Sequence, residues 1–186
     1  MTINIFVDMD GVLAVYEKDM VEKMHNKDFF LKLAPQKGNI SLVKSLIKDK
    51  TLNVYILSSL LASSPYVLNE KELWLNKYLP EIDARNRLFV PEGIAKSDFI
   101  NDKLVNIDKA TNVLIDDYTV NLLKWKEDGF LALKMLNGAN NTTGAWLSSN
   151  PDSYLNYRSN PKNNYKKITK IVTKHLEKKK IRWYKH

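Results

Sequence analysis

The chain has 186 residues, of which 44% are hydrophobic, and a formal net charge of +8. This size and composition predict one globular domain with a sizeable core and leave room for a small insertion. The absence of cysteine excludes disulfides and thiolate metal sites, so a reducing, cytoplasmic setting is expected. The first apolar run ends at Asp8 and Asp10, which a signal peptide or membrane span would not tolerate, and no membrane segment is expected elsewhere.

Short apolar runs alternate along the chain with patterns of helical periodicity. The runs expected to form strands are 3–7, 52–57, 86–90, 112–116 and 130–135. The helical patterns are 39–49, 69–79, with the apolar residues Leu73, Trp74 and Leu75, and 119–128, with Val120, Leu123 and Trp125. This alternation predicts an α/β fold, a three-layer α/β/α Rossmann-like core around a parallel sheet.

The positive charge is concentrated at the end of the chain. Residues 158–186 carry eleven Lys and Arg and one acid, whereas the rest of the chain has eighteen bases and twenty acids. Five apolar residues recur here at helical spacing, namely Tyr165, Ile168, Ile171, Val172 and Leu176. We therefore predict an amphipathic helix with one face on the domain and its lysines in water. Weak attraction to nucleic acid or another polyanion is the alternative.

Polar residues gather where three of the expected strands end. They are Asp8 and Asp10 after the first strand, Ser58 and Ser59 after the second, and Asp116 and Asp117 at the end of 112–116. The carboxyl ends of parallel strands lie at one edge of a sheet, where ligands bind. Two carboxylates about 4 Å apart repel by about 4 kcal/mol at an effective dielectric of about 20. A divalent cation would relieve this repulsion, and ligands that are all oxygen favour Mg²⁺.

Each of these features has an ordinary structural interpretation when it is taken alone. An Asp-Gly pair is typical of a turn, a serine pair of a helix cap, and a lysine such as Lys96 of the surface. Their common order and their placement at strand ends favour a site.

In this order, the segments "DMDGV", "ILSS", "GIAK" and "LIDD" resemble the four motifs of the haloacid dehalogenase superfamily of phosphotransferases, over residues 3–136. More narrowly, "FVDMDGVLA" followed by "FF" and "P" resembles the 5′(3′)-deoxyribonucleotidases and their bacterial and phage relatives. The resemblance implies a Mg²⁺-dependent phosphomonoesterase that acts on a small-molecule phosphate ester, here a (deoxy)nucleoside monophosphate. Asp8 would be the nucleophile that forms an aspartyl-phosphate, and Asp10 the general acid and then the base.

The resemblance also implies roles for the other motif residues. Ser58 would donate a hydrogen bond to the phosphoryl group, and Lys96 would hold the phosphate and the nucleophile together by charge. The implied metal ligands are Asp8, Asp10 through its backbone carbonyl, Asp116 directly, and Asp117 through water. Ser58 replaces the threonine that the nucleotidases commonly have, which keeps the hydroxyl.

Residues 15–38 lie where this superfamily can insert a cap, so we expect a core of 1–14 and 39–186 and a small helical cap at 15–38, with Met20, Val21 and Met24 beneath it. The expected substrate contacts are Gly11, Tyr16, Phe29, Phe30 and Ser59. For the three aromatic residues, stacking on a base and plain core packing both remain open. A cap this short is also compatible with a phosphomonoesterase of broad substrate specificity. The Gly- and Asn-rich segment 135–146 is expected to be a surface loop.

Three other functions are considered. Response-regulator receivers use similar residues on a similar sheet, but their motifs follow a different order. A nucleic-acid-binding protein could use the basic tail and leave the pocket idle, although four clustered acids would then have no purpose. A polynucleotide end phosphatase would combine phosphatase activity with nucleic-acid binding by the tail, and its activity would depend steeply on salt.

Overall fold

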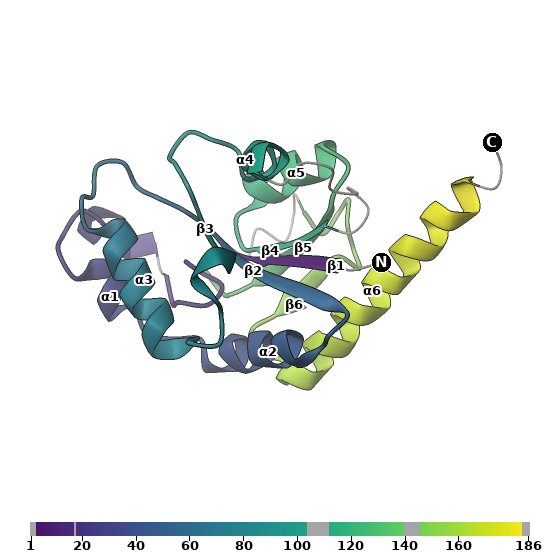
Figure 1. Cartoon of the computed structure of the whole chain (residues 1–186), viewed down its shortest axis with the longest axis horizontal. Coiled ribbons are helices and arrows are strands. Elements are labelled where there is room, and N and C mark those ends of the chain that lie inside the picture. Colours follow the sequence, from purple (N-terminus) through teal and green to yellow (C-terminus); the bar gives the residue numbers. More distant parts are fainter. Residues whose placement is uncertain (1–2, 17, 104–111, 140–145, 184–186) are drawn as a thin grey trace.

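The structure, a computed structural model, describes residues 3–16, 18–103, 112–139 and 146–183 (Figure 1). Its centre is a six-stranded sheet in the order β3-β2-β1-β4-β5-β6, and every pair of neighbouring strands is parallel. The strands are β1 (Ile3–Val7), β2 (Leu52–Ser59), β3 (Arg87–Val90), β4 (Asn112–Asp116), β5 (Leu131–Leu136) and β6 (Tyr154–Asn156). The α/β fold with a parallel sheet is confirmed.

Helices cover both faces of this sheet (Figure 1). On one face lie α2 (Lys37–Lys48) and α6 (Pro161–Trp183), and on the other lie α4 (Lys96–Lys103) and α5 (Thr119–Glu127). Successive strand side chains point to opposite faces. Ile5 and Val7 therefore belong to the core beneath α2 and α6, whereas Phe6 belongs to the core beneath α4 and α5.

The basic tail forms the expected amphipathic helix. In α6, Ile168 and Val172 are buried against the domain, and the Tyr165 hydroxyl donates to Asp49 Oδ2 over 2.7 Å. Lys166 and Lys170 are exposed to water. No helix in the described ranges has both the length and the apolar composition needed to cross a membrane.

Two helices bury different faces from those that their apolar residues indicate. In α3 (Val67–Tyr78), Leu73 is 44% exposed, while Glu70 and Lys71 are buried together with Trp74. In α5, Val120 and Leu123 are exposed and Leu122 and Trp125 are buried. The reason in α3 is geometric, because Glu70 and Lys71 lie one turn before Trp74 and Leu75 and so share the face that packs inward.

Three elements have no counterpart among the predicted ones, namely α4, β6 and the short 3-10 helix η2 (Ala84–Asn86). Strand β6 has only three residues, too few to show a pattern. Helix α4 has few apolar residues, since only Phe99 and Ile100 interrupt its polar sequence.

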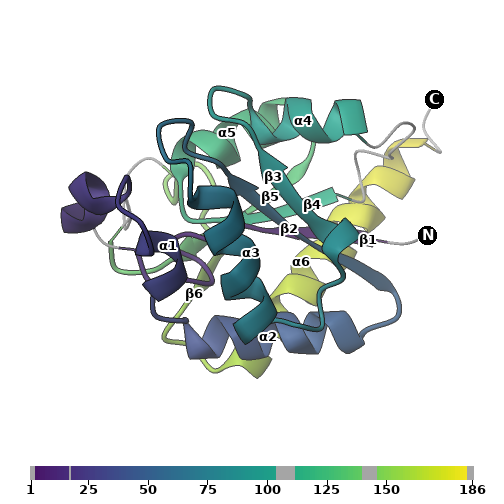
Figure 2. The same cartoon turned by 60° about the vertical axis from the view of Figure 1, so that its left-hand side comes forward.

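The segment between β1 and α2 is an excursion from the sheet at its carboxyl end (Figure 2). It contains the 3-10 helix η1 (Lys18–Lys23) and the single turn α1 (Phe29–Lys32), which packs on α3. The two ends of the segment meet, because Val15 N donates to Ala34 O over 2.8 Å and Gln36 N donates to Leu13 O over 2.7 Å. Met20 and Met24 pack against the core, and the side chain of Val21 lies outside the described residues.

Candidate active site

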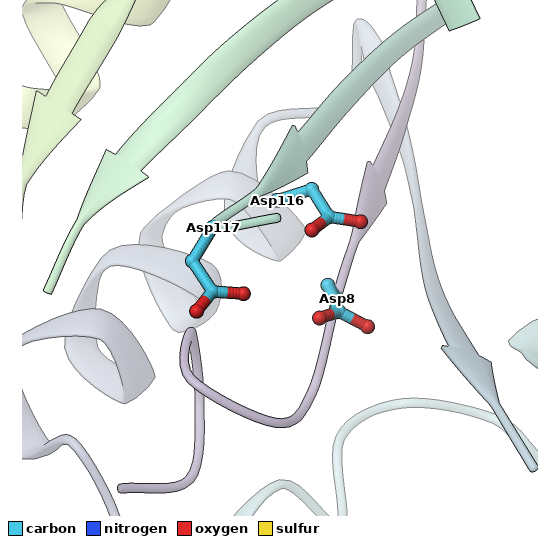
Figure 3. A group of neighbouring side chains, drawn as sticks. All are labelled: Asp8, Asp116 and Asp117. Carbon is cyan, nitrogen blue, oxygen red and sulfur yellow. The ribbon is translucent and has the colours of Figure 1, made fainter. Parts of the chain in front are cut away.

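Three buried carboxylates meet at the point where the strand order of the sheet reverses. Asp8 follows β1, Asp116 ends β4, and Asp117 comes next in the chain. Their side chains point into one space (Figure 3), and one oxygen of each lies within 4.8 Å of the others. Strands β1 and β4 are neighbours whose connections leave in opposite directions, which is where open α/β sheets bind ligands.

Lys96 is the cation among these carboxylates. It begins α4, its side chain is 2% exposed, and its Nζ lies 2.7 Å from both Asp8 Oδ1 and Asp116 Oδ2. Burial alone would lower the pKa of Lys96, but the carboxylates of Asp116 and Asp8 outweigh burial and raise this pKa above its ordinary value. Lys96 is therefore charged at neutral pH.

Asp8 shares its cationic partner, Lys96, with Asp116. Burial raises the pKa of its carboxyl, Lys96 lowers it and the neighbouring carboxylates raise it, and the net result is a pKa of about 8. Asp116, which shares Lys96 with Asp8, is held by two further donors, Tyr118 N at 2.7 Å and Asn121 Nδ2 at 3.0 Å.

The donor set fits a hard divalent cation. The three-carboxylate group contains only oxygen ligands, which is the chemistry of Mg²⁺ rather than of Zn²⁺. A cation there would also favour the ionised form of Asp8. The side chain of Asp10 is not part of this group.

Asp10 faces a second buried lysine, Lys71 of α3. Lys71 Nζ lies 2.6 Å from Asp10 Oδ2, 2.9 Å from Ser58 Oγ and 2.6 Å from Ser59 O. An ammonium only donates, so Ser58 Oγ accepts this hydrogen bond and its own hydroxyl proton remains free for another acceptor. Ser58 is fully buried near the end of β2.

The turn after β1 packs directly against Asp117. Gly11 has a φ of 79°, and a Cβ at this position would collide with the Asp117 carboxylate. Asn137, just after β5, donates to Gly11 O over 2.8 Å and to Asp117 Oδ2 over 2.7 Å. The segment 135–146 was expected to be a surface loop, and this is wrong at both ends: it begins inside β5, where Met135 is buried, and Trp146 is buried as well. Asn137 between them belongs to the site, and residues 140–145 lie outside the described residues.

A pocket of about 450 Å³ opens beside these groups. Of the predicted site residues, Asp10, Phe30, Ser59 and Lys96 line it, together with Lys71, Met24, Leu60, Leu61, Glu92, Ile94, Val120, Asn121 and Lys124. The structure thus brings a polar floor and largely apolar walls together at the carboxyl edge of the sheet.

Two of the predicted aromatic contacts, Tyr16 and Phe29, are not among the residues that line this pocket. Phe29 lines a separate hollow on the other side of α1, with Met20 and Leu33. The Tyr16 hydroxyl lies 3.2 Å from Met24 Sδ. Burial raises the pKa of Tyr16, and the carboxylates of Asp10 and Asp117 raise it further.

Sequence reasoning missed Lys71, Asn121 and Asn137. The spacing of Lys71 from Leu75 was an available signal, because it indicates the buried face of α3. Asn121 lies one turn into α5, five residues after Asp116, where a side chain can reach back to the strand end. Asn137 gave no local signal, since its contact with Gly11 depends on the order of the strands.

The chain was compared with known proteins by sequence and by structure. No family model matches it, and none of the curated proteins matches it. Among solved structures, it is similar to the D,D-heptose 1,7-bisphosphate phosphatase of Burkholderia thailandensis, with a TM-score of 0.60 and 14% identity over 86% of this chain and 94% of that one. A HAD family enzyme of Bacteroides thetaiotaomicron, solved with magnesium and inorganic phosphate, has a TM-score of 0.49 and 12% identity over 77% of this chain and 98% of that one.

At such identities the likeness establishes the fold. The Burkholderia structure shares the α/β architecture along almost its whole length. This likeness concerns the fold alone, and the resemblance of the four motifs to the haloacid dehalogenase superfamily stays a prediction. The narrower resemblance to deoxyribonucleotidases stays a prediction.

Proposed function

We propose that this protein is a Mg²⁺-dependent phosphomonoesterase that works through an aspartyl-phosphate on Asp8. The observation that carries the proposal is the position of Lys96 Nζ, 2.7 Å from Asp8 and from Asp116, in a buried cluster of three carboxylates. Repulsion within a cluster of three carboxylates destabilises a fold unless positive charge compensates it. A cation and a lysine at one sheet edge are what a transferring phosphoryl group requires.

In the proposed reaction, these residues would act in two steps, formation and hydrolysis of the aspartyl-phosphate. An Asp8 oxygen attacks phosphorus, and the bond from phosphorus to the leaving oxygen breaks as Asp10 gives that oxygen a proton. Water then attacks phosphorus, the bond to Asp8 breaks, and Asp10 takes the proton from the water. Ser58 donates its free hydroxyl proton to a phosphoryl oxygen, and Lys96 neutralises charge on the phosphate.

Asp8, Asp116 and Asp117 would hold the cation, and the backbone carbonyl of Asp10 is proposed as a further ligand. When bound, Mg²⁺ would neutralise phosphoryl charge and keep Asp8 ionised at neutral pH. Tyr118 N and Asn121 fix the Asp116 carboxylate, and Asn137 fixes that of Asp117, so the ligands are held in place before a cation binds.

For the substrate, we propose a (deoxy)nucleoside monophosphate. The pocket supports this choice because part of its wall is apolar, with Phe30, Met24 and Leu61 able to contact the face of a base. Tyr16 and Phe29 remain candidates for base contacts only if the segment 15–38 moves as a cap when substrate binds. An apolar wall of this kind would also accept other phosphate esters.

The test is phosphate release from nucleoside monophosphates and simple sugar phosphates, with and without Mg²⁺, by the wild type and by Asp8→Asn. Mg²⁺-dependent turnover of deoxynucleotides that disappears in the variant is expected. Similar turnover of many esters would retain the mechanism and remove the nucleotide preference. Absence of turnover on every ester would contradict the proposal.

A second candidate, nucleic-acid binding, rests on one observation on α6. A hollow of about 560 Å³ is lined by Lys166, Lys167, Lys170, Lys174 and His175, with Leu131 and Asp152. Leu131 begins β5, so the hollow lies at the amino edge of the sheet, opposite the carboxylate cluster. Binding of a DNA or RNA oligonucleotide that weakens steeply with salt would support this candidate, and binding unaffected by salt would contradict it.

A further inference from the structure

Lys71 is a buried cation that belongs to none of the four motifs. It is 1% exposed, although lysine is almost never fully buried without partners. Its three partners are Asp10 Oδ2 at 2.6 Å, Ser58 Oγ at 2.9 Å and Ser59 O at 2.6 Å. An ammonium has three donors, so this set uses all of them and fixes the orientation of the group.

The contact with Lys71 distinguishes the two oxygens of Asp10. Oδ2 accepts from Lys71, while Oδ1 is buried and has no hydrogen-bond partner among the described residues. With Oδ2 held, the carboxyl group cannot rotate freely. Since Oδ1 is buried while the Asp10 side chain is partly exposed, Oδ2, the oxygen that Lys71 orients, is the one left to exchange a proton with a bound molecule. Positioning of an acid or base in this way is needed at both steps of the proposed reaction.

The residue before Lys71 holds the segment that forms one wall of the pocket. Glu70, also buried, accepts from Asp28 N over 2.6 Å and from Phe30 N over 3.0 Å, and so satisfies free amides at the start of α1. The Phe30 ring lies with its centroid 4.9 Å from Lys71 Nζ. One turn of α3 therefore contacts Asp10, Ser58 and the aromatic wall together.

We propose that Lys71 is a positioning residue that holds Asp10 for proton transfer to the leaving oxygen and from the attacking water, and that Glu70 ties the pocket wall at Phe30 to the same turn. This inference rests on the proposed phosphomonoesterase function. It adds a residue of α3 to the four motif segments, and it makes the helix a support of the acid and base rather than only a cover for the core.

The experiment compares two substrates of nearly equal shape, phenyl phosphate and p-nitrophenyl phosphate. The p-nitrophenolate ion leaves readily without a proton, whereas phenolate needs one. Lys71→Met is expected to lower kcat/KM for phenyl phosphate about tenfold more than for p-nitrophenyl phosphate, since general acid catalysis contributes about 10²- to 10⁴-fold. Lys77→Met, on the exposed side of the same helix, is the matched control and should leave the ratio unchanged.

A second readout follows the base step. If Asp10 is poorly placed to take the proton from water, the aspartyl-phosphate decays slowly, and Lys71→Met should release p-nitrophenol in a burst of about one equivalent before the slow steady state. Partial unfolding would reduce both rates equally and would produce no burst.

Lys71→Arg keeps the test decisive if Lys71→Met does not fold. Its planar guanidinium keeps the charge but cannot satisfy three oxygens arranged around a point, so the substrate ratio should move in the same direction by a smaller factor. An unchanged ratio in the folded variants, with no burst, would overturn the role of Lys71 while leaving the phosphatase intact. A wild type that hydrolyses neither ester would overturn the proposed function, and this inference with it.

Discussion

Lysine side chains occupy two very different settings in this molecule. At the carboxyl edge of the sheet, Lys71 and Lys96 are buried, and each lies within 3 Å of carboxylate oxygens. On α6, Lys166 and Lys170 are exposed. The positive net charge of the chain comes from the tail, residues 158–186, to which Lys166 and Lys170 belong. The chemistry proposed for the site depends on the two buried lysines. Charge composition therefore indicates little about function until the partners of each charge are known.

The difference between the two groups is largest for activity. Lys96→Met should lower kcat for phosphate esters by about 10²- to 10³-fold or more, because it removes a positioned cation from a buried site. Lys170→Met should leave kcat within twofold. Steady-state phosphate release measures both, and circular dichroism checks that both variants are folded. Equal losses in the two variants would contradict the distinction.

The turn at Gly11 allows the next sharpest comparison, since two glycines with similar φ differ in their surroundings. A Cβ at Gly11 (φ 79°) would meet Asp117, whereas a Cβ at Gly93 (φ 85°) would have no atom of the described residues within 4 Å. Gly11→Ala should cost about 1–3 kcal/mol of unfolding free energy for strained backbone, and should also weaken Mg²⁺ binding by displacing Asp117. Gly93→Ala should show only the backbone cost. Urea unfolding and Mg²⁺ titration distinguish them, and equal Mg²⁺ affinities would contradict the contact.

The acidic cluster makes a prediction about pH. The pKa of Asp8 is raised to about 8 in the folded chain, so between the unfolded value near 4 and about 8 the folded state binds the extra proton. Without metal, stability should therefore fall as pH rises through this window, by up to about 5 kcal/mol. Asp8→Asn should remove that loss and should be more stable than the wild type at pH 8. Thermal melts at pH 5 and pH 8 in a chelator measure it. A wild type that gains stability relative to the variant would contradict the raised pKa.

The smallest effect is expected on α6. Replacing Lys166, Lys170 and Lys174 by Gln should change the unfolding free energy by about 0.5 kcal/mol or less per site, as for most surface substitutions. Turnover of small esters should stay within twofold of the wild type. A loss of turnover would show that α6 contributes to the site.

Much of the architecture could be predicted from the sequence because it is encoded locally. Strands 3–7 and 112–116 are short runs of apolar residues bounded by polar ones, and the structure has the same bounds. The order of the strands then places Asp8 and Asp116 side by side. Apolar residues on the helices were a poorer guide, since Leu73 and Val120 are exposed.

The supporting residues of the site could not be predicted in the same way. A lysine in a helix is usually exposed, so composition argued against the burial of Lys71 even though its spacing from Leu75 favoured it. Asn137 touches Gly11 across 126 residues of sequence, and only the completed sheet brings them together. The motifs thus indicated the reacting groups, whereas the groups that hold them depend on tertiary contacts.

The most direct test of the central claim is to look for the phosphoryl group on Asp8. Excess wild-type protein would be mixed with a phosphate ester and Mg²⁺, quenched in acid within one turnover, digested and analysed by mass spectrometry. The account predicts a phosphorylated peptide that contains Asp8, which is absent from Asp8→Asn and from samples with a chelator. Mg²⁺-dependent hydrolysis that persists in Asp8→Asn, with no phosphorylated peptide from the wild type, would contradict it.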